Sequence, residues 1–391
     1  MKKISFIIPS HNNLMYLKAA YNSIRDNYKH DIIMLDDASD DGTWDWLQEI
    51  DKNDISVKVY RNDGKKLGHT ILYDVGVDIC TTDIFSIFHA DMICSPLYVE
   101  NLLKHLKEKT VVSATRIEPP LHPHGKEKIV MDFGLWPDEI KYNEFLFFCD
   151  KKREEFKDVT TKGIFAPWLM YKKDFQDIGG HDPLFAPFPY EDSDIFNRFI
   201  LAGYGIIQSR DSFVYHLTCR GHRWTSGELG KNDDMYPIYE KNARRNYIRK
   251  WGSWIKNDEY LKPIIPPKYD IGFKAFNCDI NLLKELEPWC SKIYLDSGSD
   301  YMHEYRLSEQ PNTLFDLDER IKLYGNVNLT EYHDVIVEFD CNLLTPQNFQ
   351  ILVNLSEILQ ESGEVGDMEL EIFKFKIKSL DTYERELINA E

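Results

Sequence analysis

The N-terminal part of this chain is predicted to be a doubly wound α/β domain, and three observations support that fold class. Short apolar, β-branched runs alternate with segments whose apolar residues recur at helical spacing, a pattern typical of β-α-β units. Acidic segments directly follow two of these runs, at 35–43 and 89–91. A third acidic segment, 190–192, opens a predicted helix. Doubly wound folds bind ligands at the carboxyl ends of their strands, so these segments mark the expected site.

The predicted elements follow one another through the first 115 residues. Apolar, β-branched composition predicts buried strands at 3–8, 32–35, 57–60, 84–88 and 111–115. Helical spacing of the apolar residues predicts helices between them at 14–24, 43–50, 68–79 and 96–106. Strands that alternate with helices of this length are expected to lie parallel, joined by right-handed crossovers.

The segment 116–160 is less regular. It contains proline- and histidine-rich turns and a charged run at 150–157, so we interpret it as loops and an insertion that can serve as a mobile lid. From Ile164 the regular pattern resumes. The sequence there predicts an apolar strand, a short helix, a turn at 178–182, a helix at 193–201 and strands at 205–208 and 213–216.

A proline cluster at 263–267 follows Trp251 and Gly252 and predicts a domain boundary. We therefore expect two domains, 1–255 and 256–391. The second is also predicted to be α/β, with apolar runs at 271–276, 293–295 and 335–339, helices at 280–287 and 347–359, and a half-exposed strand at 373–378. It shows no motif that indicates a chemistry.

Charge is spread unevenly between the two predicted domains. The chain has 47 basic and 65 acidic residues, a net charge of −18. Residues 256–391 hold 13 Lys and Arg against 27 Asp and Glu, so they carry −14 of that charge. An acidic C-terminal part argues against wrapping nucleic acid or lying on an anionic membrane. The acidic C-terminal domain is the part of the chain through which oligomers would form.

Composition also predicts the compartment. The apolar runs all fall short of the roughly 18 residues that a spanning helix needs. The seven Cys form no CxxC pair, which indicates reduced thiols and neither a disulfide framework nor a zinc site. The N-terminus enters a strand pattern directly, without a signal peptide. We therefore expect a cytoplasmic protein with no membrane span.

The first two motifs of the chain together resemble family 2 glycosyltransferases of the GT-A fold. They are Ser5-Phe6-Ile7-Ile8-Pro9-Ser10-His11-Asn12 and Asp36-Asp37-Ala38-Ser39-Asp40-Asp41-Gly42-Thr43, and the resemblance covers roughly residues 3–220. It implies a Rossmann-like mixed sheet and a sugar nucleotide held by Pro9, Ser10, His11, Asn12 and Asp37. His11 stands where Tyr is usual, but an imidazole can still stack on a base. The alternative is that Asp37, Ser39 and Asp41 cap the following helix.

The segment 61–69 supplies two further candidates for donor binding, Asn62 and His69. In the family this segment lies near the nucleotide, and a Gly-rich turn before a helix N-terminus suits the approach of a phosphate or ribose. The alternative is a solvated turn that uses Gly for its backbone angles.

His89-Ala90-Asp91 stands at the position of the family's Asp-x-Asp motif. The resemblance implies that Asp91 binds a divalent metal, that Ala90 lies beside the donor, and that His216 is a further ligand. Such a cation neutralises a diphosphate leaving group; oxygen ligands suit Mg²⁺ or Mn²⁺, and an imidazole at His89 favours Mn²⁺. The alternatives are that His89 is a buried strand residue and His216 a core residue.

The third acidic segment resembles the Glu-Asp pair that the family carries at a helix start. An inverting transfer needs a base to take the proton of the acceptor hydroxyl. Asp192 is the candidate base, and Glu191 positions the acceptor or shares that role. The alternative is that both acids cap the helix. Upstream, Trp168 is a candidate stacking floor for a sugar or base, or alternatively a core residue.

The resemblance implies transfer of a hexose or pentose from a nucleotide-diphosphate donor, UDP-linked above all, to a hydroxyl with inversion. The acceptor would be a saccharide. Two alternatives stay open. One is transfer to a modified DNA base, with the basic segment 241–250 on the duplex; that segment could equally be a solvated face or a docking surface for the acidic domain. The other is a non-catalytic nucleotide-sugar binder, because His replaces the first acid of the Asp-x-Asp motif.

Overall fold

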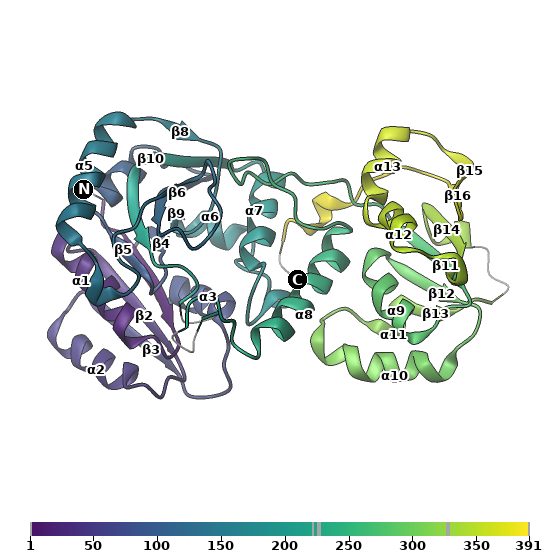
Figure 1. The fold of residues 1–391 in the computed structure, drawn as a ribbon, viewed down its shortest axis with the longest axis horizontal. Helices are drawn as coiled ribbons and strands as arrows, with labels where there is room; N and C mark the ends of the chain where they lie inside the picture. The colour runs from purple at the N-terminus through teal and green to yellow at the C-terminus, as the bar shows by residue number, and fades with distance from the viewer. Residues whose placement is uncertain (1, 221–222, 225–227, 326–328, 390–391) are drawn as a thin grey trace. The chain divides into compact units, whose positions relative to one another are not determined.

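The computed structural model describes residues 2–220, 223–224, 228–325 and 329–389. The chain forms two compact units (Figure 1). The first comprises residues 1–240, 257–264 and 389–391, and the second comprises 241–256 and 265–388. The predicted division of the chain at residue 255 stays a prediction.

The first unit is built on one mixed sheet in the order β3-β2-β1-β4-β9-β6-β10-β5. The strands on this path are β1 (Ser5–Ser10), β2 (Asp31–Asp37), β3 (Val57–Asn62), β4 (Ile84–Ile87), β5 (Met92–Cys94), β6 (Thr110–Glu118), β9 (Trp168–Tyr171) and β10 (Gly205–His216). The pairings of β1 with β2 and β4 are parallel, as predicted. The strands β9 and β5 run antiparallel to their neighbours, which makes the sheet mixed.

Helices cover both faces of this sheet, as a doubly wound fold requires. They are α1 (Leu14–Asn27), α2 (Thr43–Asn53), α3 (His69–Ile79), α4 (Tyr98–Leu103), α6 (Lys172–Asp177) and α7 (Glu191–Leu201). On one face, the ring of Phe6 stacks on Tyr98 of α4 at 6.0 Å. On the other, α3 lies so close to β1 that a Cβ at Gly76 would be 2.3 Å from Ile7 Cγ2. Side chains alternate across a strand, so neighbouring positions of β1 serve opposite faces.

The last strand of the unit corrects one expectation. Two short strands were predicted at 205–208 and 213–216, but the structure has one strand, β10, whose register with β6 shifts between Gln208 and Phe213. The polar residues at 209–212 suggested a break. They are buried, and Ser209 Oγ donates to Asp211 Oδ1 at 2.6 Å, so their polar groups are paired inside the fold.

The segment 116–160 is more regular than the sequence indicated. It contains β7 (Lys128–Val130), the 14-residue helix α5 (Tyr142–Glu155) and β8 (Thr160–Thr161). The helix was missed because its apolar residues form the continuous run 145–149, which does not mark one face: Phe145 and Cys149 are buried, whereas Phe147 is exposed. Its buried face packs on β10 through Phe145 and Tyr215, whose rings lie 5.8 Å apart.

The second unit is a smaller α/β unit with the sheet order β13-β12-β11-β14-β16-β15. Its strands are β11 (Ile271–Phe276), β12 (Lys292–Leu295), β13 (Ile321–Leu323), β14 (Val335–Asp340), β15 (Gly366–Leu370) and β16 (Phe373–Ile377). The helices that follow β11 are α9 (Ile280–Leu286), α10 (Ser299–Glu309), α11 (Leu317–Arg320), α12 (Pro346–Val353) and α13 (Leu355–Ser362). The one helix predicted at 347–359 is in fact two, because Asn354 has non-helical backbone angles between them.

The basic segment 241–250 lies in α8 (Tyr236–Trp251). Two of its cations pair with acids of the second unit. Arg245 Nε lies 2.7 Å from Glu309 Oε1, and Arg249 Nη2 lies 2.7 Å from the fully buried Glu287 Oε2. Breaking such a buried pair is costly, so these arginines hold the second unit together.

Candidate active site

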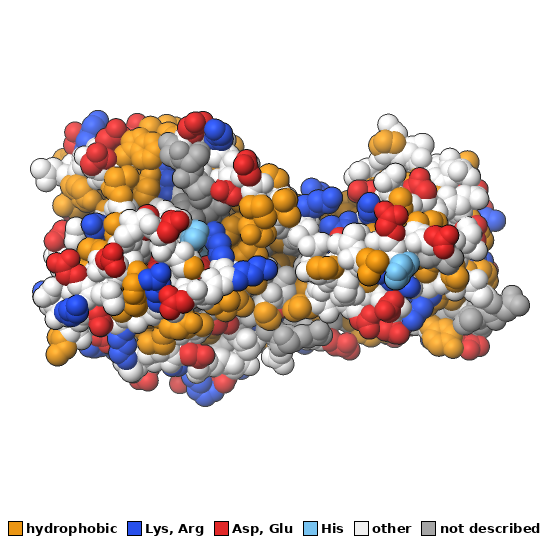
Figure 2. Space-filling view, turned by 90° about the horizontal axis from the view of Figure 1, so that it is seen from below, with side chains coloured by type: hydrophobic (Ala, Val, Ile, Leu, Met, Phe, Trp, Pro, Cys, Tyr) orange, Lys and Arg blue, Asp and Glu red, His pale blue; other side chains and the backbone are white. Residues whose placement is uncertain are grey.

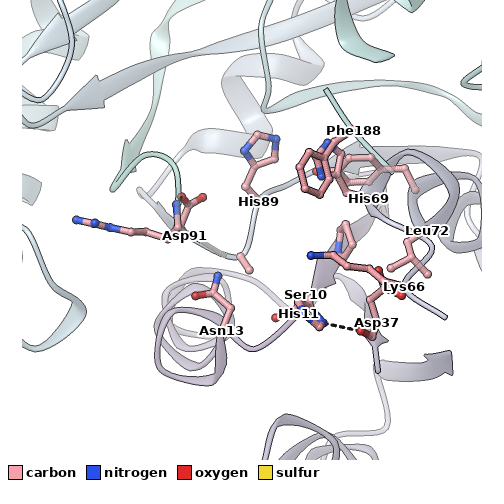
Figure 3. Close-up of a pocket in the computed structure, with 14 residues that line it drawn as sticks. Ser10, His11, Asn13, Asp37, Lys66, His69, Leu72, His89, Asp91 and Phe188 are labelled. Carbon is pink, nitrogen blue, oxygen red and sulfur yellow. Dashed lines mark hydrogen bonds between the residues drawn. The ribbon is translucent and has the colours of Figure 1, made fainter. Parts of the chain in front are cut away.

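A pocket with about 580 Å³ of empty space opens at the carboxyl ends of β1, β2 and β4. The sheet order reverses at β1, because β2 and β3 lie on one side of it and β4 on the other. Such a switch point is where doubly wound sheets bind ligands. Figure 3 shows the pocket. Of the predicted site residues, the structure brings these to its lining: Pro9, Ser10, His11, Asp37, His69, His89, Ala90 and Asp91.

At one end of the pocket, the carboxylate of Asp37 is buried and already bound to protein groups. Its Oδ1 accepts hydrogen bonds from Asn62 Nδ2 (2.7 Å) and Leu67 N (3.0 Å), and its Oδ2 accepts from Gly68 N at 2.8 Å. Asp37 thus fastens the loop before α3, and Oδ2 keeps one lone pair for a ligand donor. The carbonyl of Asp37 accepts a hydrogen bond from His11 Nδ1 at 2.6 Å, which sets the orientation of that ring (Figure 3).

Asn12 and Asn62 lie outside the pocket lining. Asn12 is exposed; its N–H donates to Ser39 Oγ, and its side-chain oxygen accepts from Asp40 N, both at 2.9 Å. The amide of Asn62 binds Asp37 and the carbonyl of Lys65. Both asparagines therefore fasten the turns around the pocket.

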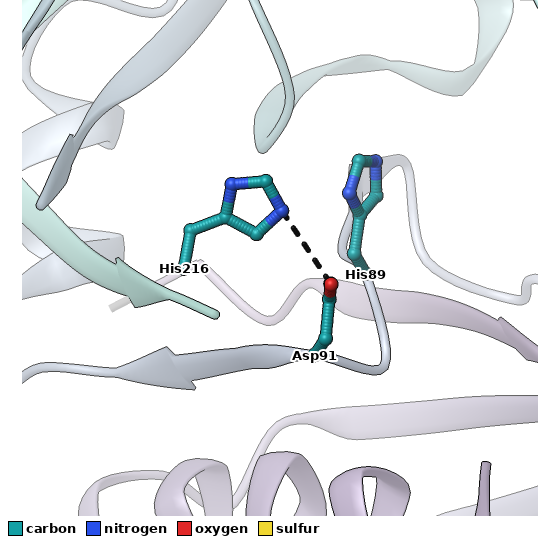
Figure 4. A group of neighbouring side chains, drawn as sticks. All are labelled: His89, Asp91 and His216. Carbon is teal, nitrogen blue, oxygen red and sulfur yellow. Dashed lines mark ion pairs between the residues drawn. The ribbon is translucent and has the colours of Figure 1, made fainter. Parts of the chain in front are cut away.

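On the other side of the pocket, His89, Asp91 and His216 offer ligand atoms that all lie within 4.8 Å of one another. Figure 4 shows the three side chains converging from the end of β4, the start of β5 and the end of β10. His216 Nε2 is 3.5 Å from Asp91 Oδ1. Two imidazole nitrogens and one carboxylate suit a divalent first-row metal such as Mn²⁺ better than Mg²⁺, which prefers oxygen alone. The residues present therefore fit the expected cation.

The electrostatics of this cluster are dominated by opposite charges. Burial raises the pKa of Asp91, but His216 and His89 lower it more, so its pKa lies well below the usual range. Burial lowers the pKa of His216, whereas Asp91 and Glu118 raise it to about 9. Glu118 was not predicted from the sequence; its Oε1 accepts from His216 Nδ1 at 2.9 Å. A carboxylate on the outer nitrogen orients the imidazole so that Nε2 faces a metal.

Arg220 also lines the pocket and was not predicted. Its side chain is 4% exposed, and its guanidinium lies 4.7 Å from the ring centroid of Trp136. Nη2 donates to the carbonyl of Leu135 at 2.9 Å. Nε and Nη1 have no hydrogen-bond partner among the residues that the structure describes. A buried cation with unused donors beside Asp91 suits an anionic ligand. In the sequence, Arg220 follows the predicted metal ligand His216 by only four positions, and this proximity could have indicated that it lies near the site.

The predicted acid pair begins α7, and its two members have different surroundings. Glu191 is buried, and its Oε1 accepts a hydrogen bond from His69 Nε2 at 2.6 Å. Burial raises the pKa of Glu191, but the charge and hydrogen bond of His69 lower it to about 2. Glu191 is therefore ionised. The same contact shows that His69, expected beside the nucleotide, is bound to the acid pair.

Asp192 is only half-buried. Its Oδ1 accepts from the N–H of Ser193 at 2.6 Å. Burial and the charge of Glu191 raise the pKa of Asp192 to about 6. A carboxylate that titrates near neutral pH is well matched to accept a proton from a hydroxyl.

Trp168 is not brought to the pocket. Its side chain is 2% exposed and packs edge-on against Phe85, at 5.8 Å, and Phe199, at 6.0 Å. It belongs to the hydrophobic core of the first unit. The aromatic side chains of Tyr73 and Phe188 line the pocket instead.

The fold and the site describe an α/β protein with a pocket at the switch point of its sheet, a cluster of side chains that could hold a metal ion, and an acid pair at the start of α7. The model of the family described as glycosyl transferase family 2 matches residues 5–177. Residues 5–177 thus form a glycosyl transferase family 2 domain, and the mixed α/β sheet of residues 1–216 has the predicted GT-A-like architecture.

The solved structures that match this chain include GalNAc-T7 crystallised with UDP, GalNAc and Mn²⁺. It shares 15% sequence identity, and the match covers 63% of this chain and 48% of that one with a TM-score of 0.45. The chain thus spans about half the length of that relative. No curated protein matches the sequence. In the described parts of the chain, none of the helices has the length and apolar character needed to cross a membrane.

Proposed function

We propose that this chain is a metal-dependent glycosyltransferase that moves a sugar from a UDP-linked donor to an acceptor hydroxyl with inversion at the sugar carbon. One observation carries the proposal. His89 and Asp91, two of the three residues in the candidate cation cluster, line the same pocket as the turn formed by Pro9, Ser10 and His11. A nucleoside site and a cation site in one pocket are what a nucleotide-diphosphate donor requires.

The donor would lie across the pocket. The turn at Pro9–His11 and the free lone pair of Asp37 Oδ2 would hold the nucleoside, with the ring of His11 beside the base. His89, Asp91 and His216 would hold a divalent cation, which supplies neutralisation of the charge on the leaving diphosphate. Arg220 would donate to the phosphate oxygens through Nε and Nη1.

Asp192 would act as the base. As the acceptor oxygen bonds to the sugar carbon, its proton moves to a carboxylate oxygen of Asp192 and the bond from the sugar to the diphosphate breaks. Oδ1 is held by Ser193, so Oδ2 is the oxygen left for the proton. Attack from the face opposite the diphosphate gives inversion. Glu191 stays ionised at the start of α7 and lines up the acceptor side.

The alternative of a DNA acceptor has no supporting observation. Two arginines of the basic segment, Arg245 and Arg249, are buried and paired with Glu309 and Glu287, so they are not available to phosphates. Figure 2 shows basic and acidic side chains interspersed over the face in view, without a broad basic patch. A nucleic-acid surface usually concentrates positive charge.

Thermal shift with a panel of nucleotide-sugars, with and without Mn²⁺, tests the proposal. A ligand that binds the folded state raises the melting temperature by mass action, so a UDP-sugar should do so and Mn²⁺ should enlarge the effect. Asp91→Asn should remove the Mn²⁺-dependent part, while Asp51→Asn on the exposed side of α2 should not. If the UDP-sugar raised the melting temperature equally with Mn²⁺, with EDTA and in Asp91→Asn, the metal dependence would be disproved. Transfer to a saccharide hydroxyl by the confirmed donor then tests the reaction.

A further inference from the structure

The start of α3 is tightly fitted against the segment that leads into α7. Gly68, just before the helix, has φ of +82°, and a Cβ there would lie 2.2 Å from the carbonyl oxygen of Pro187. Thr70 Oγ1 donates to the same carbonyl at 3.1 Å. Only glycine tolerates this approach and this backbone angle together. The first residue of α3, His69, is therefore held at a fixed distance from Glu191.

Two contacts fix the imidazole of His69 itself. Its ring is nearly parallel to that of Phe188, with an interplanar angle of 9° and centroids 5.3 Å apart. Nε2 donates to Glu191 Oε1 at 2.6 Å. The stack sets the plane of the ring and the hydrogen bond sets its direction. The second oxygen of Glu191, Oε2, is enclosed and has no hydrogen-bond partner within the described part of the chain.

The charges around the acid pair come from several elements. Glu191 faces His69 of α3, His181 of the preceding turn, and Tyr73 and Tyr236. Asp192 faces Glu191, His69 and Tyr73, and Lys66 lies near His69. Burial lowers the pKa of His69, but Glu191 and Asp192 raise it overall, which favours an ion pair between His69 and Glu191.

We propose that His69 is a positioning residue of the acid pair and not a nucleotide ligand. Its imidazolium binds Glu191 and keeps that carboxylate ionised, which leaves Asp192 as the single proton acceptor. This inference rests on the proposed function, in which Asp192 is the base. It extends that function by explaining why two adjacent acids have different roles.

Two substitutions should move the acid limb of the pH profile, the range in which activity falls as the pH is lowered, in opposite directions. In His69→Gln, the negative charge of Glu191 is no longer balanced, so the pKa of Asp192 should rise and the acid limb of kcat/KM should move up by about one pH unit. In Glu191→Gln, the negative neighbour is lost, so the acid limb should move down by about the same amount. A nucleotide ligand would behave differently, because its loss raises the donor KM and leaves the limb in place.

The experiment measures kcat, the KM for the donor and the pH profile for the full chain and for His69→Gln, His69→Phe and Glu191→Gln. His69→Phe keeps an aromatic ring on Phe188 but not the hydrogen bond, so it should behave as His69→Gln does. His303→Gln, on the exposed side of α10 in the second unit, is the matched control and should change nothing. Melting temperatures report whether each variant folds.

A carboxyl titration followed by ¹³C NMR on Asp-labelled protein gives the same shifts without activity, with the Asp192 signal assigned by its loss in Asp192→Asn. Opposite shifts in the two variants, with donor KM within about twofold, support the inference. A raised donor KM with an unmoved limb, or shifts of the same sign, overturns it. Full activity of Asp192→Asn would instead overturn the proposed function, so the two failures are distinguishable.

Discussion

Glu118 Oε1 lies 2.9 Å from His216 Nδ1, at the end of the first sheet where β6 and β10 run side by side. Glu118 is itself held by Arg116 and Lys128, each with a nitrogen 2.9 Å from one of its oxygens. Burial raises the pKa of Glu118, but Arg116, His216 and Lys128 together hold it well below its usual range. The carboxylate therefore stays ionised and fixes the ring of His216 with Nε2 toward Asp91.

The first prediction concerns this contact. In Glu118→Gln the side chain keeps its shape but loses its charge, so the orientation of His216 and its basicity as a ligand should suffer. Loss of such a partner typically weakens metal binding by about 10- to 100-fold. Titration calorimetry with Mn²⁺ measures the loss directly, with the exposed Glu139→Gln as control. Unchanged Mn²⁺ affinity would show that Glu118 has no part in the cation site.

The second prediction concerns Arg220. If its free donors bind the diphosphate, Arg220→Gln should weaken the binding of UDP by at least tenfold, because a charge-assisted hydrogen bond contributes more than about 1.4 kcal/mol. Uridine lacks phosphates, so its affinity should stay the same. Comparing the two ligands by calorimetry removes effects on folding. Equal losses for UDP and uridine would place the arginine away from the phosphates.

The third prediction is the pH dependence of the transfer. The pKa of Asp192 is raised to about 6 by burial and by Glu191, and only the ionised carboxylate can accept a proton. Activity should therefore increase as the pH rises through about 6 and fall about tenfold per unit below it. Asp192→Asn should lower kcat by about 10²- to 10⁴-fold at every pH while donor affinity is kept. If Asp192→Asn kept the same fall in activity below pH 6 as the unchanged protein, that fall would be due to the titration of another group.

The fourth prediction separates the two roles considered for Trp168. As a core residue, its removal in Trp168→Ala should lower the free energy of unfolding by about 3–5 kcal/mol and leave the nucleotide Kd of the folded protein unchanged. Urea denaturation and nucleotide titration measure the two effects. A small loss of stability together with a weaker Kd would place the ring against the donor and contradict its position in the structure.

Much of the fold follows from patterns that are local in the sequence. The strands from Ser5 to Ile87 and the helices between them were predictable because their apolar residues alternate or recur regularly. The helix α5 was not, since its continuous apolar run 145–149 does not mark one face and only contact with Tyr215 shows which side is buried. The same applies to β10, whose polar middle is paired only within the folded sheet.

The acids and histidines of the candidate site could be named from motifs, because strand ends and helix starts place such residues at one edge of a sheet. Their partners could not. Glu118 is separated from His216 by 98 positions and Glu191 from His69 by 122, so no spacing in the sequence indicates either pair. Arg220 needed the pocket to show that its donors are unused.

Local chemistry thus decides which segments become strands and helices and which side chains can bind a metal or a proton. The path of the chain through space decides which of them meet. Trp168 illustrates the difference: it has the right chemistry to stack on a sugar or base, yet its ring fills the core. The effects of neighbouring charges and of burial on a side chain are strongest within a few ångströms. Only folding brings residues so distant in the chain within that range.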